Sequence, residues 1–172
     1  MEIYEGKIIE INENLISERL EMLSAELIFE SDIKSWYFDF SDKRLKNHNK
    51  ILRVRKIGNN MILSLKENHH NDNINLYEEH DIEFNDFEEM SYILKKLDIK
   101  EHAYDFRQRL SYKLNDTIVK ISIYPEIPAF LSIEANSEDE LKESVVLLGF
   151  SMKDIKPWSS KDVLDFYFNK DN

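Results

Sequence analysis

The sequence predicts an α+β fold that combines many antiparallel strands with about four helices. Three observations support this class. Runs in which apolar and polar residues alternate recur along the chain, as in half-buried strands. Residues that favour tight turns, such as Gly58 and Asn115, separate neighbouring runs and indicate hairpins. Other segments carry apolar residues at the spacing of one helix face.

Length and composition limit the classes of protein that the chain can belong to. A chain of 172 residues is expected to form a single domain over 1–172, and 42% hydrophobic residues are too many for a disordered protein. No apolar run reaches the length of a membrane span, and no leader is apparent, so we expect a cytoplasmic protein without a membrane partner. The net charge of -11 argues against a nucleic-acid partner, and the absence of cysteine excludes disulfides and thiolate metal sites.

The first part of the chain alternates between strands and one helix. The expected elements are a strand in 1–11, a helix in 12–27, one or two strands in 26–40, a polar loop over 41–50 and a hairpin over 51–68. Ile16, Leu20 and Leu23 have helical spacing and support the helix. Gly58-Asn59-Asn60 marks the turn of the hairpin, since Gly and Asn tolerate positive φ angles.

The second part of the chain repeats this style of structure. The expected elements are a loop over 69–75, a strand over 76–84, a helix over 85–97, a hairpin over 103–124, a strand over 129–135 and helices over 136–150 and 159–168. The apolar side of the helix over 85–97 is formed by Phe87, Met90, Leu94 and Leu97. Asn85 or Asp86 can cap this helix. Ser137 and Glu140 predict a capping box for the next helix, and Gly149 predicts its end.

Polar residues alternate with apolar residues on most of the predicted strands. These polar positions are Glu5, Lys7, Arg53, Arg55, Ser64, Lys66, Glu79, Asp81, Arg109, Lys120, Ser122, Ser132 and Glu134. A solvated sheet face is the simpler interpretation, because antiparallel sheets commonly expose one face. However, Arg53 and Arg55 would share a face with Lys66 of the partner strand, where the cations repel unless anions compensate them. The alternative is a closed sheet whose interior binds a polyphosphate.

Several short motifs resemble those of the CYTH family, the triphosphate tunnel proteins that include class IV adenylyl cyclases, thiamine triphosphatases and inorganic triphosphatases. The motifs that carry the resemblance are FDFSDKRL, ILRVRK with the Leu-Arg-x-Arg pattern, ILSLKEN, EEHDIEF, RQRLSY with the Arg-x-x-Tyr pattern, and IYPEIPAFLSIEA. The resemblance extends over nearly the whole chain. It implies an antiparallel β-barrel or tunnel of about eight strands with flanking helices.

The resemblance also assigns ligand-binding roles to particular residues. The residues implied to bind the phosphates are Lys7, Arg53, Arg55, Lys66 and Arg109. The residues implied to hold a magnesium or manganese ion are Glu5, Glu79, Asp81 and Glu134. Three carboxylates of the family pattern are replaced in this chain by Ile3, Ser122 and Ser132. Because serine brings no negative charge to offset the ion, these replacements should weaken metal binding.

Two further positions bear on the electrostatics of such a site. Glu2 could replace the lost carboxylate at Ile3 if the strand slipped by one residue, but that slip would turn every side chain of the strand to the other face. Lys120 has the same parity as Ser122 and could supply part of the positive charge of a metal ion. Alternatively, its long side chain could extend from the barrel edge to water.

Three functions remain open on these observations. A metal-dependent enzyme of this family would hydrolyse a triphosphate or convert ATP to cyclic AMP, and its catalytic residues are not identified by the sequence. A non-catalytic protein would bind a triphosphate-bearing molecule such as ATP, tripolyphosphate or thiamine triphosphate. A structural or protein-interaction domain is less consistent with five retained basic residues, because buried cations without an anion are unfavourable. The resemblance also allows a homodimer.

Other side chains are weaker candidates for functional groups. His69 and His70, with Asp72 nearby, could bind a metal, although histidines in a connecting loop are usually solvent-exposed. Trp36 and Trp158 could stack on a ligand, but a place in the core is the more common role of tryptophan.

Overall fold

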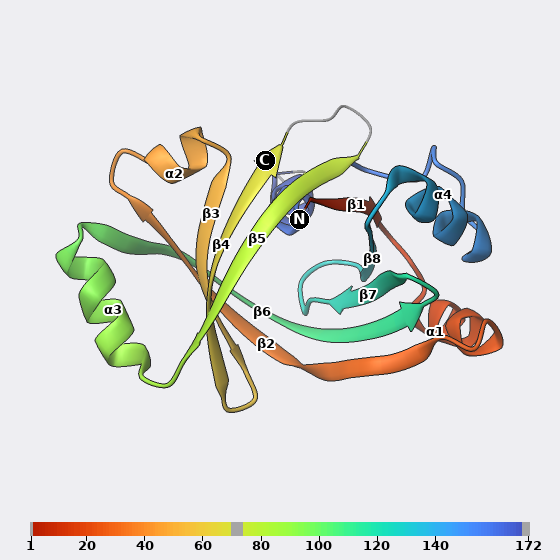
Figure 1. Cartoon of the computed structure of the whole chain (residues 1–172), viewed down its shortest axis with the longest axis horizontal. Coiled ribbons are helices and arrows are strands. Elements are labelled where there is room, and N and C mark those ends of the chain that lie inside the picture. The colour runs from red at the N-terminus through yellow and green to blue at the C-terminus, as the bar shows by residue number, and fades with distance from the viewer. Residues whose placement is uncertain (1, 70–73, 170–172) are drawn as a thin grey trace. The chain divides into compact units, whose positions relative to one another are not determined.

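Eight strands and five helices follow one another in the computed structural model, which describes residues 2–69 and 74–169 (Figure 1). The strands are β1 (Ile3–Ile8), β2 (Glu26–Phe40), β3 (Lys50–Ile57), β4 (Asn60–His69), β5 (Asn75–Phe84), β6 (Ile99–Leu114), β7 (Thr117–Ile123) and β8 (Phe130–Ala135). The helices are α1 (Glu13–Met22), α2 (Arg44–Asn47), α3 (Phe87–Lys96), α4 (Glu138–Leu147) and α5 (Ser160–Phe168). The strands form a closed barrel in the order β1-β5-β4-β3-β2-β6-β7-β8, which confirms the predicted α+β barrel.

The chain divides into two compact units. Unit 1 comprises Met1–Glu30, His70–Tyr77 and Gln108–Asn172. Unit 2 comprises Ser31–His69 and Glu78–Arg107. Each unit has a hydrophobic core and a polar sheet face of its own.

In unit 1, alternate residues of β1, β7 and β8 build the main hydrophobic core. The buried core residues of these strands include Ile8, Val119, Ile121, Leu131 and Ile133, and Ile16 and Leu20 of α1 join them. Helix α4 packs against the same strands and adds Leu141 and Val145 (Figure 1). Because side chains alternate across a strand, the polar residues of β1, β7 and β8 lie on the opposite face.

Gly6 allows a close approach within unit 1. A Cβ atom at this position would lie 2.7 Å from Cδ1 of Ile155, so the absence of a side chain leaves room for Ile155 beside β1. The backbone of Lys7 exchanges hydrogen bonds with that of Lys156, at 3.1 Å and 2.8 Å. The segment before α5 is thereby joined to β1.

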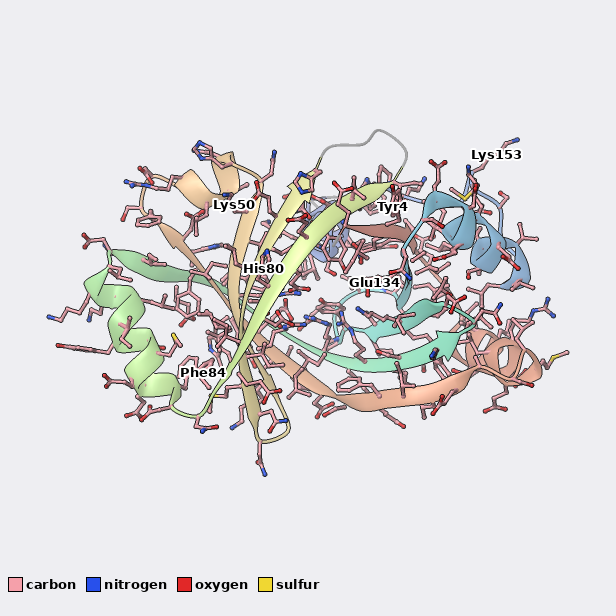
Figure 2. All side chains as sticks on the ribbon, viewed as in Figure 1. Tyr4, Lys50, His80, Phe84, Glu134 and Lys153 are labelled. Atoms are coloured by element: carbon pink, nitrogen blue, oxygen red, sulfur yellow. The ribbon has the colours of Figure 1, made fainter. Side chains whose placement is uncertain are left out.

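In unit 2, a second core lies between α3 and the sheet. Phe38, Val54 and Leu94 are its buried members. The partly buried residues packed against them are Trp36, Leu52, Leu63, Phe84, Phe87, Met90 and Ile99, of which Phe84 is labelled in Figure 2. Trp36 also contacts the rings of Phe87 and Tyr104, at centroid distances of 4.8 Å and 5.4 Å, which confirms its predicted core role.

Two element boundaries and the position of one side chain differ from the sequence prediction. Helix α1 ends at Met22 rather than continuing to residue 27, because Ser24 has a φ angle of 56° and the chain turns into β2. Strand β6 begins at Ile99, earlier than predicted. Leu97 caps the end of α3 and is exposed, so its predicted place on the apolar side was wrong.

The segment over 41–50, predicted as a polar loop, contains a short helix. Helix α2 forms there because Asp39, at the end of β2, accepts hydrogen bonds from the backbone N–H groups of Leu45 and Lys46, at 3.0 Å and 3.1 Å. These are donors that the first turn of a helix cannot satisfy internally.

The predicted helix caps are largely present. Asp86 caps α3, and Oγ of Ser137 accepts a hydrogen bond from the backbone N–H of Glu140. The Glu140 carboxylate accepts from the N–H of Asn136 instead of Ser137, so the capping box is only half formed. Gly149 has a φ angle of 88° and ends the last turn of α4 as predicted.

Candidate functional site

The polar face of unit 2 carries an arginine cluster, which consists of Arg53, Arg55, Ser64, Lys66, Glu79 and Asp81. The alternation of β3 puts Arg53 and Arg55 on the same face, and the register of β3 and β4 places Arg53 opposite Ser64. Lys66 follows Ser64 at the same parity and is buried. The structure therefore brings the three predicted phosphate-binding residues of unit 2 onto one side of its sheet.

Two carboxylates of β5 compensate the arginines. Nη2 of Arg53 donates a hydrogen bond to Oε1 of Glu79 at 2.6 Å. Nη2 of Arg55 donates to Oδ2 of Asp81 and to Oγ of Ser64, both at 2.8 Å, and lies 3.6 Å from Oε1 of Glu79. Both carboxylates are therefore engaged by arginine side chains, and Arg55 lies within ion-pair distance of each of them.

Burial makes the charges of the arginine cluster interact strongly. Burial alone would raise the pKa of Glu79, but the positive charges of Arg53 and Arg55 outweigh it and lower the pKa to about 2. Burial, together with the charge of Arg53, lowers the pKa of Arg55 from its usual value, against the influence of Glu79 and Asp81. The crowding of two guanidinium groups is the electrostatic condition that an additional anion would relieve.

A second buried arginine of unit 2 was not predicted from the sequence. Arg107 of β6 is fully buried, and its Nη1 donates to Oδ1 of Asp105 at 2.6 Å and to Oγ of Ser35 at 3.2 Å. Tyr37 donates its hydroxyl to the other oxygen of Asp105 at 2.5 Å. The available signal was the alternation Asp105, Arg107, Arg109 along one strand.

The polar face of unit 1 carries a lysine cluster. Its members are Glu5, Lys7, Asn75, Tyr77, Arg109, Lys120, Ser122, Ser132 and Glu134, of which Glu134 is labelled in Figure 2. The register of β1 and β8 places Glu5 directly opposite Glu134, and Lys7 opposite Ser132. Lys120 of β7 lies opposite Ser132 from the other side. The registers also exclude the one-residue slip of β1, since Glu5 and Lys7 are buried whereas Glu2 is exposed.

Every oxygen of the two carboxylates in this cluster accepts a hydrogen bond. Glu5 accepts from Lys7 and, at 2.7 Å, from Nδ2 of Asn75. Glu134 accepts from Lys120 and, at 2.8 Å, from the hydroxyl of Tyr77. Lys7 also donates to Oγ of Ser132 at 3.0 Å.

Burial and mutual attraction have opposing effects on the pKa values of Lys120 and Glu134. Burial would raise the pKa of Glu134, but the ammonium group of Lys120 outweighs burial and the pKa is lowered. Burial lowers the pKa of Lys120, and the carboxylate of Glu134 opposes that change. Both oxygens of Glu134 act as hydrogen-bond acceptors, as expected for a carboxylate.

The donor set of the lysine cluster does not fit a divalent metal ion. Lysines and neutral donors occupy the oxygens of Glu5 and Glu134, and the serines at positions 122 and 132 bring no charge. Within residues 2–69 and 74–169, no group of three or more His, Cys, Asp or Glu side chains is arranged to hold a metal ion. The two carboxylates predicted as ligands in unit 2 are likewise engaged by arginines.

Two remaining hypotheses from the sequence have different outcomes. The histidine site stays a prediction, because His70 and Asp72 lie outside the described residues. Trp158 contacts the ring of Phe166 at 5.1 Å and packs against the core that contains Tyr124 and Phe130, as predicted.

No helix in the described parts of the chain is long and apolar enough to cross a membrane.

Comparison with solved structures gives extensive matches. A protein from Pyrococcus horikoshii OT3, PH1012, is 25% identical with a TM-score of 0.78, and the match covers 92% of this chain and 96% of that one. A Vibrio parahaemolyticus protein described as a candidate adenylate cyclase is 13% identical with a TM-score of 0.82, covering 95% and 97% of the two chains. HpAC1 from Hippeastrum, described as a candidate adenylyl cyclase with a dominant triphosphatase activity, is 14% identical with a TM-score of 0.69, covering 98% and 96%.

Sequence comparison identifies the family. No curated protein matches the chain at a significant level. The family description that matches is that of the CYTH domain, over residues 4–154, which includes both polar clusters. The barrel, the basic residues on its strands and this match over most of the sequence lead to one conclusion: the chain belongs to the CYTH domain family.

Proposed function

We propose that this protein binds a triphosphate-bearing molecule, such as tripolyphosphate, ATP or thiamine triphosphate, and that it does so without hydrolysing or cyclising it. The observation that carries the proposal is the arginine cluster. Arg53 and Arg55 lie on one face of β3, with side chains only 12% and 11% exposed. Such a concentration of partly buried guanidinium groups is suited to a multiply charged phosphate anion.

The partners of the arginines support exchange with a ligand. Arg55 is paired with Asp81, whose side chain is 46% exposed, so this carboxylate can return to water when a phosphate replaces it. Glu79 is only 16% exposed and remains to compensate Arg53. The family resemblance assigns the same type of ligand to Lys66 in unit 2 and to Lys7 and Arg109 in unit 1.

The state of the carboxylates supports binding without turnover. Chemistry in this family depends on a divalent ion, as the resemblance implies, and the donor set of this chain does not fit such an ion. Metal-dependent hydrolysis is the second candidate function. It is favoured by the five basic residues that this chain retains and by the triphosphatase activity named for HpAC1.

Titration calorimetry with tripolyphosphate tests the binding proposal. We expect saturable binding to the native protein in buffer that contains EDTA, with affinity that falls as salt screens the charges. Arg53→Ala with Arg55→Ala should weaken it by about tenfold or more. Arg44→Ala is the matched control, because Arg44 is an exposed arginine that pairs with Asp42 on the surface of the same unit, and this variant should bind normally.

Two further arms make this experiment decisive. Arg53→Met with Glu79→Gln removes both members of the closest ion pair, and Asp81 remains to compensate Arg55, so a loss of binding in this variant, once shown to be folded, reflects the loss of the arginine. Release of phosphate or formation of cyclic AMP is measured with Mg²⁺ or Mn²⁺ and each triphosphate. Background rates with every substrate are expected, whereas metal-dependent turnover would establish the second candidate function.

A further inference from the structure

We propose that Lys120 takes the place of a divalent metal ion in the lysine cluster, so that unit 1 binds the phosphate groups of its ligand directly through ammonium and hydroxyl groups. This inference rests on the proposed function, because it concerns how the same type of ligand is held. It goes beyond that function because it predicts that the bound state needs no metal ion.

The first observation is the position of the two lysines. Ser132 of β8 lies between Lys7 of β1 and Lys120 of β7 in one row across three neighbouring strands. Each lysine donates to a different carboxylate, Glu5 or Glu134, and these carboxylates are themselves direct neighbours across β1 and β8. Like charges directly opposite each other repel, and the two ammonium groups supply the compensation that a metal ion would otherwise provide.

The second observation is the charge of the cluster. Two carboxylates, Glu5 and Glu134, face two ammonium groups, and Arg109 contributes one further positive charge opposite Ser122. Among these five side chains, the positive charges outnumber the negative charges by one. A divalent cation would increase this excess, whereas a phosphate would neutralise it.

The third observation is an unused hydroxyl group. Ser122 is completely buried, and its Oγ has no hydrogen-bond partner within the part of the chain that the structure describes. It has the same parity on β7 as Lys120, so both side chains lie on the polar face of that strand. A buried hydroxyl without a partner is unfavourable, and it can donate a hydrogen bond to a phosphate oxygen.

These groups define the chemistry of the ligand. An ammonium group has three donors, of which Lys120 uses one on Glu134 in the described contacts. The others can bind phosphate oxygens, but an ammonium group cannot activate a water molecule as a metal ion does. The lysine cluster is thus suited to hold a polyphosphate anion and not to hydrolyse it.

The test compares tripolyphosphate binding by calorimetry in EDTA and in Mg²⁺. The native protein should bind in EDTA, and Mg²⁺ should not increase its affinity. Lys120→Met should weaken binding in EDTA by about tenfold or more, the effect of losing charge-assisted hydrogen bonds. Lys113→Met is the matched control, since Lys113 is exposed on the adjacent strand β6, and its affinity should be unchanged.

A charge-balanced variant guards against simple misfolding. Lys120→Met with Glu134→Gln removes both members of the pair, leaves the net charge unchanged, and should also bind at least about tenfold more weakly. Native-like affinity in this folded double variant would overturn the proposal.

Metal binding provides an independent readout. When Mn²⁺ alone is added to the native protein, electron paramagnetic resonance should detect no binding at a defined site. Lys120→Ala combined with Ser122→Asp and Ser132→Glu should create one, because it removes the competing cation and adds two carboxylates. A specific Mn²⁺ site in the native protein would contradict the inference.

Failure of the inference is distinguishable from failure of the proposed function. If the native protein binds tripolyphosphate only when Mg²⁺ is present, Lys120 does not replace the metal, but the protein is still a triphosphate binder. If it binds under neither condition, the proposed function itself is wrong.

Discussion

Glu5 and Glu134 lie directly opposite each other on β1 and β8, and each is held by a different lysine: Glu5 by Lys7, and Glu134 by Lys120. Carboxylates in this arrangement are a common basis for a metal site. In this chain the two carboxylates instead form ion pairs with lysines. The contribution of these ion pairs to the stability of the protein can be measured.

The pair of Lys120 and Glu134 predicts an asymmetric effect on stability. Lys120→Met alone leaves Glu134 charged in a largely buried position and should lower the free energy of unfolding by about 3–5 kcal/mol. The corresponding decrease in Tm is roughly 10 °C. Chemical denaturation measures this loss, and Lys120→Met with Glu134→Gln should be markedly more stable than the single variant. Equal stability of the two variants would show that the carboxylate is not held in place by the lysine.

The lowered pKa of Glu79 predicts a dependence of stability on pH. Its pKa is about 2 in the folded protein and 4.5 in the unfolded chain, so the folded state favours the carboxylate. The stabilisation is present above pH 4.5 and is lost as the pH falls towards 2. Its upper limit is roughly 3 kcal/mol. Urea denaturation at a series of pH values should show this loss, and Glu79→Gln should have a flatter profile over that range. Parallel profiles would contradict the assignment.

Gly6 predicts a steric coupling with Ile155. Gly6→Ala should destabilise the protein by about 1–3 kcal/mol, because the new methyl group would overlap Cδ1 of Ile155. Ile155→Val removes that atom and should recover part of the loss when the two changes are combined. The measurement is a double-mutant cycle of unfolding free energies. Strictly additive effects would indicate that the two residues do not restrict each other.

Asp39 predicts a specific role in forming α2. Its Oδ2 accepts from the N–H of Lys46, and an asparagine amide nitrogen could not accept that hydrogen bond. Asp39→Asn should therefore cost about 1–3 kcal/mol and increase hydrogen exchange at Leu45 and Lys46. Asp32→Asn is the control, since Asp32 is exposed on the same strand, β2. Similar exchange rates in both variants would argue against the capping role.

The strands and most helices could be predicted because their signals are local. Alternation identified β3 and β4, and Gly58 located the turn between them. Helix α2 was missed because its capping residue, Asp39, lies at the end of the preceding strand and the helix itself has no apolar face. In so short a polar segment, intrinsic helix propensity is too weak a signal to predict a helix. The helix depends on hydrogen bonds to Asp39, which the sequence pattern does not reveal.

The polar residues of the candidate site could be predicted, but their partners could not. Parity on a strand indicates which residues share a face, as for Lys120 and Ser122. It does not indicate which neighbouring strand supplies the compensating charge, because that depends on sheet order and register. The pairing of Lys120 with Glu134 is therefore a result of the fold. Arg107 was missed for a similar reason, since its burial follows from Asp105, Ser35 and the surrounding strands.

The backbone hydrogen bonds between Lys7 and Lys156 define the smallest fragment in which the lysine cluster should remain intact. Strand β5 pairs with β1 from Ile3 to Glu5, and the hydrogen bonds to Lys156 continue the pairing of β1 at Lys7. The match to the CYTH domain ends at residue 154, just before this contact and before the packing of Ile155 on Gly6. A chain truncated at that boundary would release one edge of β1 at the position that carries Lys7. Expression of the domain alone should therefore extend at least through Lys156.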